Sequence, residues 1–363
     1  MKRLGVVISF SGDGGVERMV TNLCAEFAKQ VHVDLLAIKG AGGHASRIPS
    51  TVTLIPLKAK HSWTSVGEIA RYLKAARPDA LLVAKDRAGR AALRATARAG
   101  LQIPVYIRLG TNLSAALERK DAFSRWLRVA PMRRLYPRAA GVVAVSEGVR
   151  QDTIKVTGLA PERVHVIRNP VITSTLATQA AEPVPHDWLR DKRLPVVMGM
   201  GRLTQQKDFS TLVRAFARIQ ETHPSRLILL GEGKDRDALQ QLVVELKVAE
   251  RVLLAGFQKN PYAWLARADL FVLSSAWEGS PNALTEALAL GIPSVSTDCP
   301  SGPVEILDRG RYGPLVAVGD VAGMAAAMQR TLTHPLSAET LREAVREYRA
   351  DISASRYLQL VLG

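Results

Sequence analysis

The sequence has few cysteines, few aromatic residues and no long apolar run. Cys24 and Cys299 are the only cysteines, too few and too far apart for a disulfide framework or a metal knuckle, so a reducing cytoplasm is the expected setting. No segment approaches the roughly 20 apolar residues of a membrane-spanning helix, so we do not expect the chain to cross a membrane. Hydrophobic residues make up 47% and aromatic residues 5%, a balance typical of a soluble α/β protein.

Acidic residues are scarce in the first half of the chain. Residues 1 to 180 contain 28 Lys and Arg against 12 Asp and Glu, a net charge of +16, whereas residues 181 to 363 contain 21 of each. All the excess positive charge therefore belongs to the first half. This asymmetry favours an extended anionic partner, a nucleic acid or an anionic membrane surface, over solubilising arginines scattered on the surface.

Two successive series of strand and helix patterns divide the chain. Short apolar runs alternate with amphipathic helical patterns, which predicts βαβ units and parallel sheets. We therefore expect two doubly wound α/β domains, at residues 1–170 and 196–336, each large enough to bury its own core. A stretch with several prolines, residues 171–195, is expected to link them. Residues 337–363 form an amphipathic helical pattern that could return to brace the first domain.

The stretch "SAWEGSPNALTEALALG" places Glu278 and Glu286 eight positions apart. A buried strand is expected to end near Ser275, and a helix to begin with Ser280 as N-cap and Pro281 as its first residue. Glu278 then lies in the loop and Glu286 inside the helix. A helix N-terminus offers free N–H groups and partial positive charge, which suit a diphosphate, so the two acids would bracket one nucleotide sugar. An ordinary capped helix with surface acids explains the spacing equally well.

A second stretch, "MGMGRLTQQKDFSTLVRAF", runs from strand to loop to helix and carries Arg202 and Lys207 beyond a strand end. Two fixed cations could bind a diphosphate and stabilise the charge that it gains as a glycosidic bond breaks. Taken alone, this loop is more often a solvated loop than a phosphate clamp. Together with the two acids it indicates a ligand site beyond the carboxyl ends of the strands, in a cleft between the domains.

These motifs carry a resemblance to a known family. The Glu278 to Glu286 element, "GRLTQQKD", "GEGKDRDAL", "AGFQKNPYAWLARADLFVLSSAWEG" and the early "GDGGVER" resemble the retaining GT-B glycosyltransferases of family 4. The resemblance extends over nearly the whole chain. It implies two Rossmann-like domains that face each other across a cleft. It also implies transfer of a hexosyl or N-acetylhexosaminyl unit from a nucleoside diphosphate sugar, with UDP favoured, to a hydroxyl group, with retention and without a cofactor.

The resemblance implies roles for side chains on the donor. Arg202 and Lys207 would hold the diphosphate, Glu286 would bind the ribose, and Glu278 would face the transferred sugar. The segment around Phe257 would frame the base.

It implies backbone contacts as well. The N–H groups of Asn282, Ala283 and Leu284 would assist with the distal phosphate. Gly14 and Gly15, in "GDGG", would let the backbone approach the donor phosphates and the acceptor closely.

The acceptor side departs from the family pattern. The family commonly has a histidine just beyond a first-domain strand, but here "VYIRLGTNLS" places Arg108 and Thr111 there. We take Arg108 and Thr111 as acceptor candidates, together with Asp86, which follows another strand end in "LLVAKDRAGR". The alternative for Asp86 is that it only caps the next helix.

The segment "GEGKDRDAL" contains Asp235, Arg236 and Asp237, a pattern that resembles the metal-binding D-x-D of a different glycosyltransferase fold. Its place between a strand and a helix predicts instead a helix start with acids at its positive end. We expect no divalent metal.

Residues 119 to 138 interleave cations with Trp126, Leu127, Met132 and Leu135. This composition suits an anionic bilayer surface and predicts a peripheral enzyme at the cytoplasmic face with a lipid-linked or glycan acceptor. A pair of first-domain helices with a solvated face is the alternative.

Two other functions compete with the transferase. A sugar-nucleotide 2-epimerase shares the layout and the diphosphate grip but transfers nothing. A non-enzymatic nucleic-acid-binding protein would explain the positive charge, but the basic half lacks a recognisable motif and has few stacking aromatics. We therefore expect no nucleic-acid partner.

Overall fold

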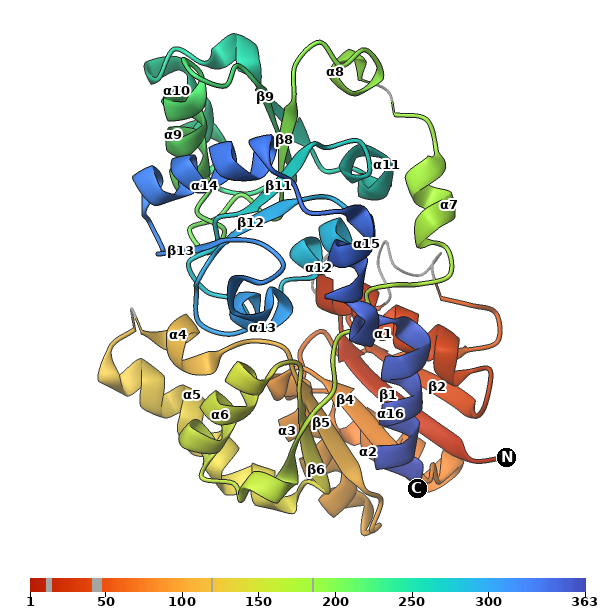
Figure 1. The fold of residues 1–363 in the computed structure, drawn as a ribbon. Helices are drawn as coiled ribbons and strands as arrows, with labels where there is room; N and C mark the ends of the chain where they lie inside the picture. The colour runs from red at the N-terminus through yellow and green to blue at the C-terminus, as the bar shows by residue number, and fades with distance from the viewer. Residues whose placement is uncertain (11–14, 41–47, 119, 185) are drawn as a thin grey trace. The chain divides into compact units, whose positions relative to one another are not determined.

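The structure, a computed structural model, describes residues 1–10, 15–40, 48–118, 120–184 and 186–363. The chain forms two compact α/β units (Figure 1). Unit 1 contains Met1–Val171 together with Tyr348–Gly363, and unit 2 contains Ile172–Glu347.

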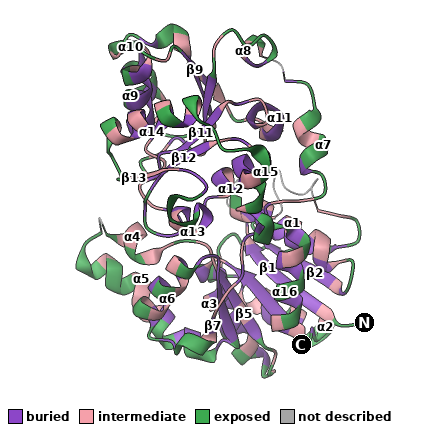
Figure 2. Cartoon of the chain, viewed as in Figure 1, coloured by how far each residue is buried: buried purple, intermediate pink, exposed green. Residues whose placement is uncertain are grey.

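Unit 1 is built on a seven-stranded sheet in which every pair of neighbouring strands is parallel. The strand order is β3-β2-β1-β4-β5-β6-β7. The strands are β1 (Arg3–Ser9), β2 (His32–Ile38), β3 (Thr53–Pro56), β4 (Ala80–Ala84), β5 (Val105–Leu109), β6 (Gly141–Ala144) and β7 (Val164–Val166). The central strands are largely apolar and buried because helices cover both faces of the sheet, as Figure 2 shows by their burial.

Successive residues of a strand point to opposite faces, so β1 contributes to two cores. Leu4, Val6 and Ile8 pack with one cluster, and Val7 packs with the other. The Val7 cluster includes residues of α2 (Val66–Ala76), α3 (Asp86–Ala99), α5 (Ala122–Leu135) and α6 (Glu147–Thr157). The opposite cluster includes residues of α1 (Gly15–Phe27) and α16 (Ala350–Leu362). A short helix, α4 (Leu113–Leu117), precedes α5.

The last helix of the chain, α16, belongs to unit 1, whereas residues 337–347 of the range expected to return, including α15 (Ala338–Glu343), belong to unit 2. Ala354, Tyr357, Leu358 and Val361 of α16 are buried in the same cluster as the inner face of α1. The rings of Tyr357 and Phe27 meet edge to face, with 6.2 Å between their centroids. Helix α16 therefore supplies part of the core of the first domain.

Unit 2 contains a six-stranded parallel sheet in the order β10-β9-β8-β11-β12-β13. The strands are β8 (Val196–Met200), β9 (Arg226–Leu230), β10 (Val252–Gly256), β11 (Leu270–Leu273), β12 (Ser294–Thr297) and β13 (Leu315–Val316). Apart from β13, these strands repeat the order of the first five strands of unit 1. The predicted doubly wound fold is therefore confirmed in both halves of the chain.

Helices lie on both sides of this second sheet. One core cluster joins α9 (Phe209–Ile219), α10 (Arg236–Glu245) and α14 (Val321–Thr333). Helix α12 (Asn282–Ala289) contacts β11, β12 and α15 (Ala338–Glu343) instead. The remaining helices are α7 (Leu176–Ala181), α8 (Asp187–Arg190), α11 (Pro261–Leu265) and α13 (Pro303–Ile306). Helices α7 and α8 thus occupy the range expected to be a linker.

The strand order creates a switch point in each sheet. The chain moves outward from β8 to β9 and β10, and then returns to place β11 on the other side of β8. Helix α9, which follows β8, and helix α12, which follows β11, pack in different clusters. Their N-termini therefore diverge beyond the carboxyl ends of β8 and β11, which is where doubly wound sheets bind ligands. The ends of β1 and β4 form the equivalent point in unit 1.

Among the described helices, none combines the length and the apolar character required to cross a bilayer.

Replacing Tyr357 with alanine should destabilise unit 1, because it removes a fully buried ring from the joint between α16 and α1. Large aromatic-to-alanine changes in a core cost about 3 to 5 kcal/mol. Urea unfolding followed by tryptophan fluorescence and circular dichroism should show an earlier first transition. Gln359→Ala, at an exposed position of the same helix, is the matched control. Equal midpoints for the two variants would contradict the structural role of α16.

Candidate active site

The Arg202 to Lys207 loop and the loop that holds Glu278 both emerge at the switch point of unit 2. The first follows β8, which ends at Met200, and the second follows β11, which ends at Leu273. Because β8 and β11 are neighbours, the two motifs that the sequence separates by about 70 residues start side by side.

Hydrogen bonds join the two loops directly. The Ala276 N–H donates to the Gln206 carbonyl at 2.8 Å, and the Gln206 side-chain amide donates to the Trp277 carbonyl at 3.0 Å. The Ser274 hydroxyl donates to the Lys207 carbonyl at 2.8 Å. These three bonds fix the backbone of Lys207 relative to the Glu278 loop.

Lys207 and Glu278 form an ion pair at the centre of this arrangement. The Lys207 Nζ atom lies 2.5 Å from Glu278 Oε1, and the Ser275 hydroxyl donates to the same oxygen at 2.8 Å. The two side chains are only 16% and 9% exposed, so the pair is shielded from water and its attraction is stronger than that of a surface pair. The structure therefore brings together two of the predicted site residues, Lys207 and Glu278.

Two glycines allow the Arg202 loop to lie on the neighbouring segment. A Cβ atom on Gly231 would lie 1.9 Å from the Gly201 carbonyl oxygen, and one on Gly233 would lie 2.2 Å from the Leu203 carbonyl oxygen. The Leu203 N–H also donates to the Glu232 carbonyl at 2.9 Å. The "GEG" sequence is thus required by close backbone contact.

Arg202 itself is exposed at the edge of the sheet. Within the described part of the chain, its side chain forms no ion pair with Glu278 and no hydrogen bond to Lys207 or Glu278. The structure therefore places Arg202 on the loop that holds Lys207 but does not bring the two cations into contact.

The helix after Glu278 begins one residue later than predicted. Pro281 occupies the N-cap position, and α12 starts at Asn282. The expectation that Ser280 is the N-cap and Pro281 the first helical residue was wrong, because Pro281 has an extended φ, ψ of −73°, 100°. The helix has no capping hydrogen bond from the N-cap side chain. Asn282, Ala283 and Leu284 form the first turn, as a phosphate-binding helix N-terminus requires.

Glu286 lies in the second turn of α12 and is fully buried. The Tyr262 hydroxyl of α11 donates to its Oε1 atom at 3.3 Å. The sequence reasoning missed Tyr262, although it lies within a quoted motif, because nothing in the spacing links it to an acid 24 positions away. Phe257 follows β10 at the same edge of the sheet, and its side chain is largely exposed.

Cys299 lies close to the ion pair without taking part in it. Burial and, to a lesser extent, the nearby charge of Glu278 raise the pKa of the Cys299 thiol to about 12. Burial likewise raises the pKa of Cys24 to about 12. Both thiols therefore stay protonated at neutral pH and are poor nucleophiles.

The first-domain candidates lie in unit 1, each in a different setting. Gly14 falls outside the described residues. Gly15 is the first residue of α1 and is exposed, and Thr111 is exposed in the segment between β5 and α4. The roles implied for these three residues stay predictions.

Asp86 is engaged in a buried network. Its carboxylate pairs with Arg90 at 3.0 Å and with Arg128 at 2.9 Å, and it accepts a hydrogen bond from the Tyr136 hydroxyl at 3.0 Å. The network holds α5 against α3. Asp86 is also the first residue of α3 rather than its N-cap, which is Lys85. The acceptor contact predicted for Asp86 stays a prediction, and the role visible here is structural.

Arg108 is also buried, at the end of β5. Its guanidinium donates to the Asn169 side chain, just before the chain leaves unit 1. It also lies near Tyr357 of α16, where burial raises the pKa of the tyrosine and Arg108 partly opposes the shift. Arg108 thus fixes the last residues of the first segment and the returning helix within one unit.

Lys85, rather than Asp86, points into the switch point of unit 1. Its ammonium lies 2.6 Å from Glu17 Oε1 in the first turn of α1 and 3.0 Å from the Ser9 carbonyl at the end of β1. The backbone of Lys85 has φ 74° and ψ 142°, a conformation rare for a residue with a side chain. Such strain is often found at functional sites.

The D-x-D pattern lies at a helix start, as predicted. Asp235 is the N-cap residue of α10, and Arg236 and Asp237 are in its first turn. Over the residues that the structure describes, no group of three His, Cys, Asp or Glu side chains is placed to hold a metal ion.

Family profiles match both halves of the chain. Residues 13–175 match the profile described as Glycosyltransferase Family 4, and residues 194–334 match Glycosyl transferases group 1. These two matches extend over most of the chain and agree with the two doubly wound units. The chain belongs to the family 4 glycosyltransferases and is a glycosyltransferase of the GT-B fold.

Characterised relatives act in glycan synthesis. The chain is 28% identical over 342 residues, 92% of its length and 90% of the relative, to a Campylobacter jejuni enzyme. That enzyme is N-acetylgalactosamine-N,N'-diacetylbacillosaminyl-diphospho-undecaprenol 4-alpha-N-acetylgalactosaminyltransferase. The chain is also 37% identical to the lipopolysaccharide core biosynthesis glycosyltransferase LpsE of Rhizobium meliloti, over 46% of the chain and 49% of LpsE.

Solved structures agree with the fold over its full length. The apo form of the lipopolysaccharide outer core galactosyltransferase WaaB aligns with a TM-score of 0.74 at 21% identity, over 99% of each chain. Anabaena HepE, solved with UDP and glucose, aligns with a TM-score of 0.79 at 18% identity, again over 99% of each chain. At these identities the likeness supports the fold alone.

Gly233→Ala should destabilise unit 2 by about 1 to 3 kcal/mol, because the new methyl group would collide with the Leu203 backbone and displace the Arg202 loop. Gly67→Ala, in helix α2 with open space around it, is the control. It should stabilise the protein slightly, by about 0.5 to 1 kcal/mol. Chemical denaturation would measure both, and a neutral Gly233→Ala variant would contradict the close contact.

Proposed function

We propose that the protein transfers a hexosyl or N-acetylhexosaminyl unit from a nucleoside diphosphate sugar to a hydroxyl of a lipid-linked or glycan acceptor, with retention and without a divalent metal. The observation that carries the proposal is the buried Lys207–Glu278 pair at the switch point of unit 2, next to the N-terminus of α12. A fixed cation beside a helix N-terminus is an electrostatic receptor for a leaving diphosphate.

In this proposal, Lys207 and Arg202 neutralise the charge that develops on the diphosphate as the bond to the sugar breaks. Two cations and the first-turn N–H groups of α12 supply the positive charge that a metal supplies in other transferases. Glu278, which pairs with the Lys207 ammonium, faces the transferred sugar in this proposal. This reading rests on the family role of the matching residues and on their meeting in unit 2.

Retention follows without a protein nucleophile. Retaining glycosidases that form a covalent intermediate hold two carboxyl groups about 5 Å apart across one bond. Here Glu278 lies in a loop against Lys207, and Glu286 lies inside α12 against Tyr262, so we assign them to different parts of the donor. The acceptor oxygen bonds to the anomeric carbon as the bond from that carbon to phosphate breaks. The acceptor proton passes to the leaving phosphate on the same face.

The identities of the donor and the acceptor are supported by relatives. Anabaena HepE was solved with UDP and with UDP-glucose, which supports a uridine nucleotide. The Campylobacter jejuni relative is named for a diphospho-undecaprenol acceptor, and LpsE for lipopolysaccharide core synthesis. We therefore propose a UDP-sugar donor and an acceptor carried on a lipid.

Lys207→Met should lower kcat by roughly 100- to 1,000-fold, the usual cost of losing one preorganised group that stabilises transition-state charge. Glu278→Gln should also lower kcat strongly, while keeping the Ser275 hydrogen bond and the fold. Turnover would be measured as release of UDP from UDP-sugars with an undecaprenyl diphosphate glycan acceptor, at matched thermal stability.

Lys234→Met, an exposed lysine of the same unit, is the matched control and should keep full activity. A Lys207→Met variant as active as this control would contradict the proposal. An arm with UDP-N-acetylglucosamine and no acceptor tests the rival reaction, because epimerised product would favour a 2-epimerase.

Helix α5 supports the membrane partner that we propose for unit 1. Phe123, Trp126 and Leu127 are 66%, 61% and 51% exposed, and the first two rings are stacked. Met132 and Leu135, expected to join the same surface, are buried in the core instead. The apolar surface is therefore confined to the first half of the helix.

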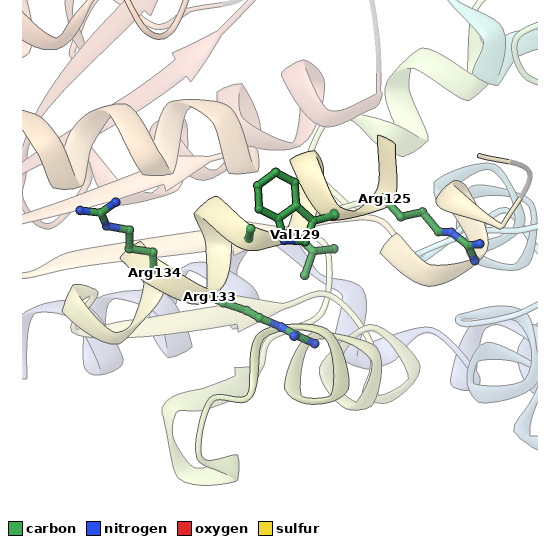
Figure 3. Close-up of a pocket in the computed structure, with 6 residues that line it drawn as sticks. Arg125, Val129, Arg133 and Arg134 are labelled. Atoms are coloured by element: carbon green, nitrogen blue, oxygen red, sulfur yellow. The ribbon is translucent and has the colours of Figure 1, made fainter. Parts of the chain in front are cut away.

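Arginines flank this apolar surface. Figure 3 shows Arg125 and Arg134 reaching away from the helix on either side of Val129, in a shallow hollow that Trp126 also lines. Within the described part of the chain, neither Arg125 nor Arg134 forms an ion pair. Exposed aromatic rings beside unpaired cations complement an anionic bilayer, where each cation contributes about 1 kcal/mol.

Flotation with vesicles that contain phosphatidylglycerol should recover the wild-type protein at low salt and release it at high salt. The double variant Phe123→Ser/Trp126→Ser should bind these vesicles at least about tenfold more weakly, because it removes the exposed apolar side chains. Trp63→Ser, which removes another exposed tryptophan of unit 1, is the control and should bind normally. Failure of the wild-type protein to float at low salt would exclude the membrane surface as partner.

A further inference from the structure

The buried carboxylate of Glu286 receives a hydrogen bond from another element of unit 2. Glu286 is fully buried on α12, and the hydroxyl that donates to its Oε1 atom belongs to Tyr262 on α11, itself 9% exposed. The O···O distance of 3.3 Å is longer than the roughly 2.7 Å typical of such bonds. The phenol therefore forms a weak hydrogen bond that orients the carboxylate without holding it tightly.

Helix α11 is held in place by its own cap. The Asn260 side chain accepts a hydrogen bond from the Tyr262 N–H at 3.1 Å. Its amide donates to the Gln179 carbonyl and to the Glu182 carboxylate, each at 2.8 Å. Asn260 therefore ties α11 to the end of α7, and the position of the Tyr262 hydroxyl is fixed by contacts that do not involve Glu286.

We propose that Tyr262 is a positioning residue for ribose recognition: it orients the Glu286 carboxylate toward the ribose hydroxyls of the donor nucleotide. This inference rests on the proposed nucleoside diphosphate donor and on the ribose role of Glu286. It adds the residue that sets the geometry of that contact.

The chemistry of the two groups supports this role. A carboxylate offers about four acceptor positions, more than the phenol of Tyr262 occupies, so the group is suited to accept from ribose hydroxyls as well. A glutamate side chain has several rotatable bonds, and fixing its rotamer before the ligand arrives lowers the entropic cost of binding. Selectivity for ribose over a deoxy sugar should therefore depend on Tyr262, although the tyrosine itself need not touch the nucleotide.

The test compares binding of UDP and 2′,3′-dideoxy-UDP by isothermal titration calorimetry. The wild-type protein should prefer UDP by about tenfold or more, because dideoxy-UDP lacks the hydroxyls that would donate to Glu286. Tyr262→Phe should weaken UDP binding and leave dideoxy-UDP binding nearly unchanged, so that the preference falls severalfold. A purely structural role would weaken both ligands equally.

Tyr312→Phe is the matched control. Tyr312 is a buried tyrosine of the same unit, and within the described residues its hydroxyl makes no hydrogen bond. This variant should keep the wild-type preference. Asn260→Ala gives a second measurement, because it keeps Tyr262 but removes the hydrogen bonds that tie α11 to the end of α7. It should also reduce the preference for UDP over dideoxy-UDP.

The outcomes separate this inference from the proposed function. A wild-type protein that binds neither UDP nor another nucleoside diphosphate overturns the proposed donor. A wild-type protein that binds UDP and dideoxy-UDP equally overturns the ribose role of Glu286, and the inference with it. A wild-type preference that persists in Tyr262→Phe and Asn260→Ala overturns the inference alone.

Discussion

The buried pair of Lys207 and Glu278 is the interaction on which the site of unit 2 depends. Removing two charges from water costs several kcal/mol per ion, and the loss is offset only where geometry and further hydrogen bonds are favourable. Here the desolvation cost is offset by the hydrogen bond from the Ser275 hydroxyl to Glu278 and by the hydrogen bonds that join the loops after β8 and β11. Neither loop would hold its charged residue in this position without the other. A third segment, "GEG" after β9, also supports the loop after β8. Its glycines are needed because that loop packs directly against its backbone.

Each unit keeps its rigid packing away from these loops. In unit 1, α16 completes the core beside α1 with residues from the end of the chain, and Arg108 fixes both α16 and the segment that leaves the unit. In unit 2, the core lies under α9, α10 and α14, and α12 is free of that cluster. Functional loops can tolerate strain and partly exposed charge because the stability comes from elsewhere in the same unit.

The sequence predicted most of the fold because buried parallel strands read as short apolar runs separated by amphipathic helices. Strand β3 gives no such signal, because it is short and partly exposed at the edge of its sheet. The sequence placed the start of α12 one residue early, because Ser280 and Pro281 form a strong capping signal that tertiary packing overrides. Candidate donor residues could be named because they lie in contiguous motifs. Tyr262 could not, because its contact with Glu286 exists only after folding.

The two switch points follow one electrostatic rule with the charges exchanged. In unit 2 the lysine follows the first strand and the acid follows the fourth, whereas in unit 1 Glu17 follows β1 and Lys85 follows β4. Helix N-termini lie at both switch points and carry partial positive charge, which favours a carboxylate there. A lysine beside each carboxylate neutralises its charge where the edge of the sheet is shielded from water. The strained backbone of Lys85 persists because its ammonium is held by Glu17 and the Ser9 carbonyl together.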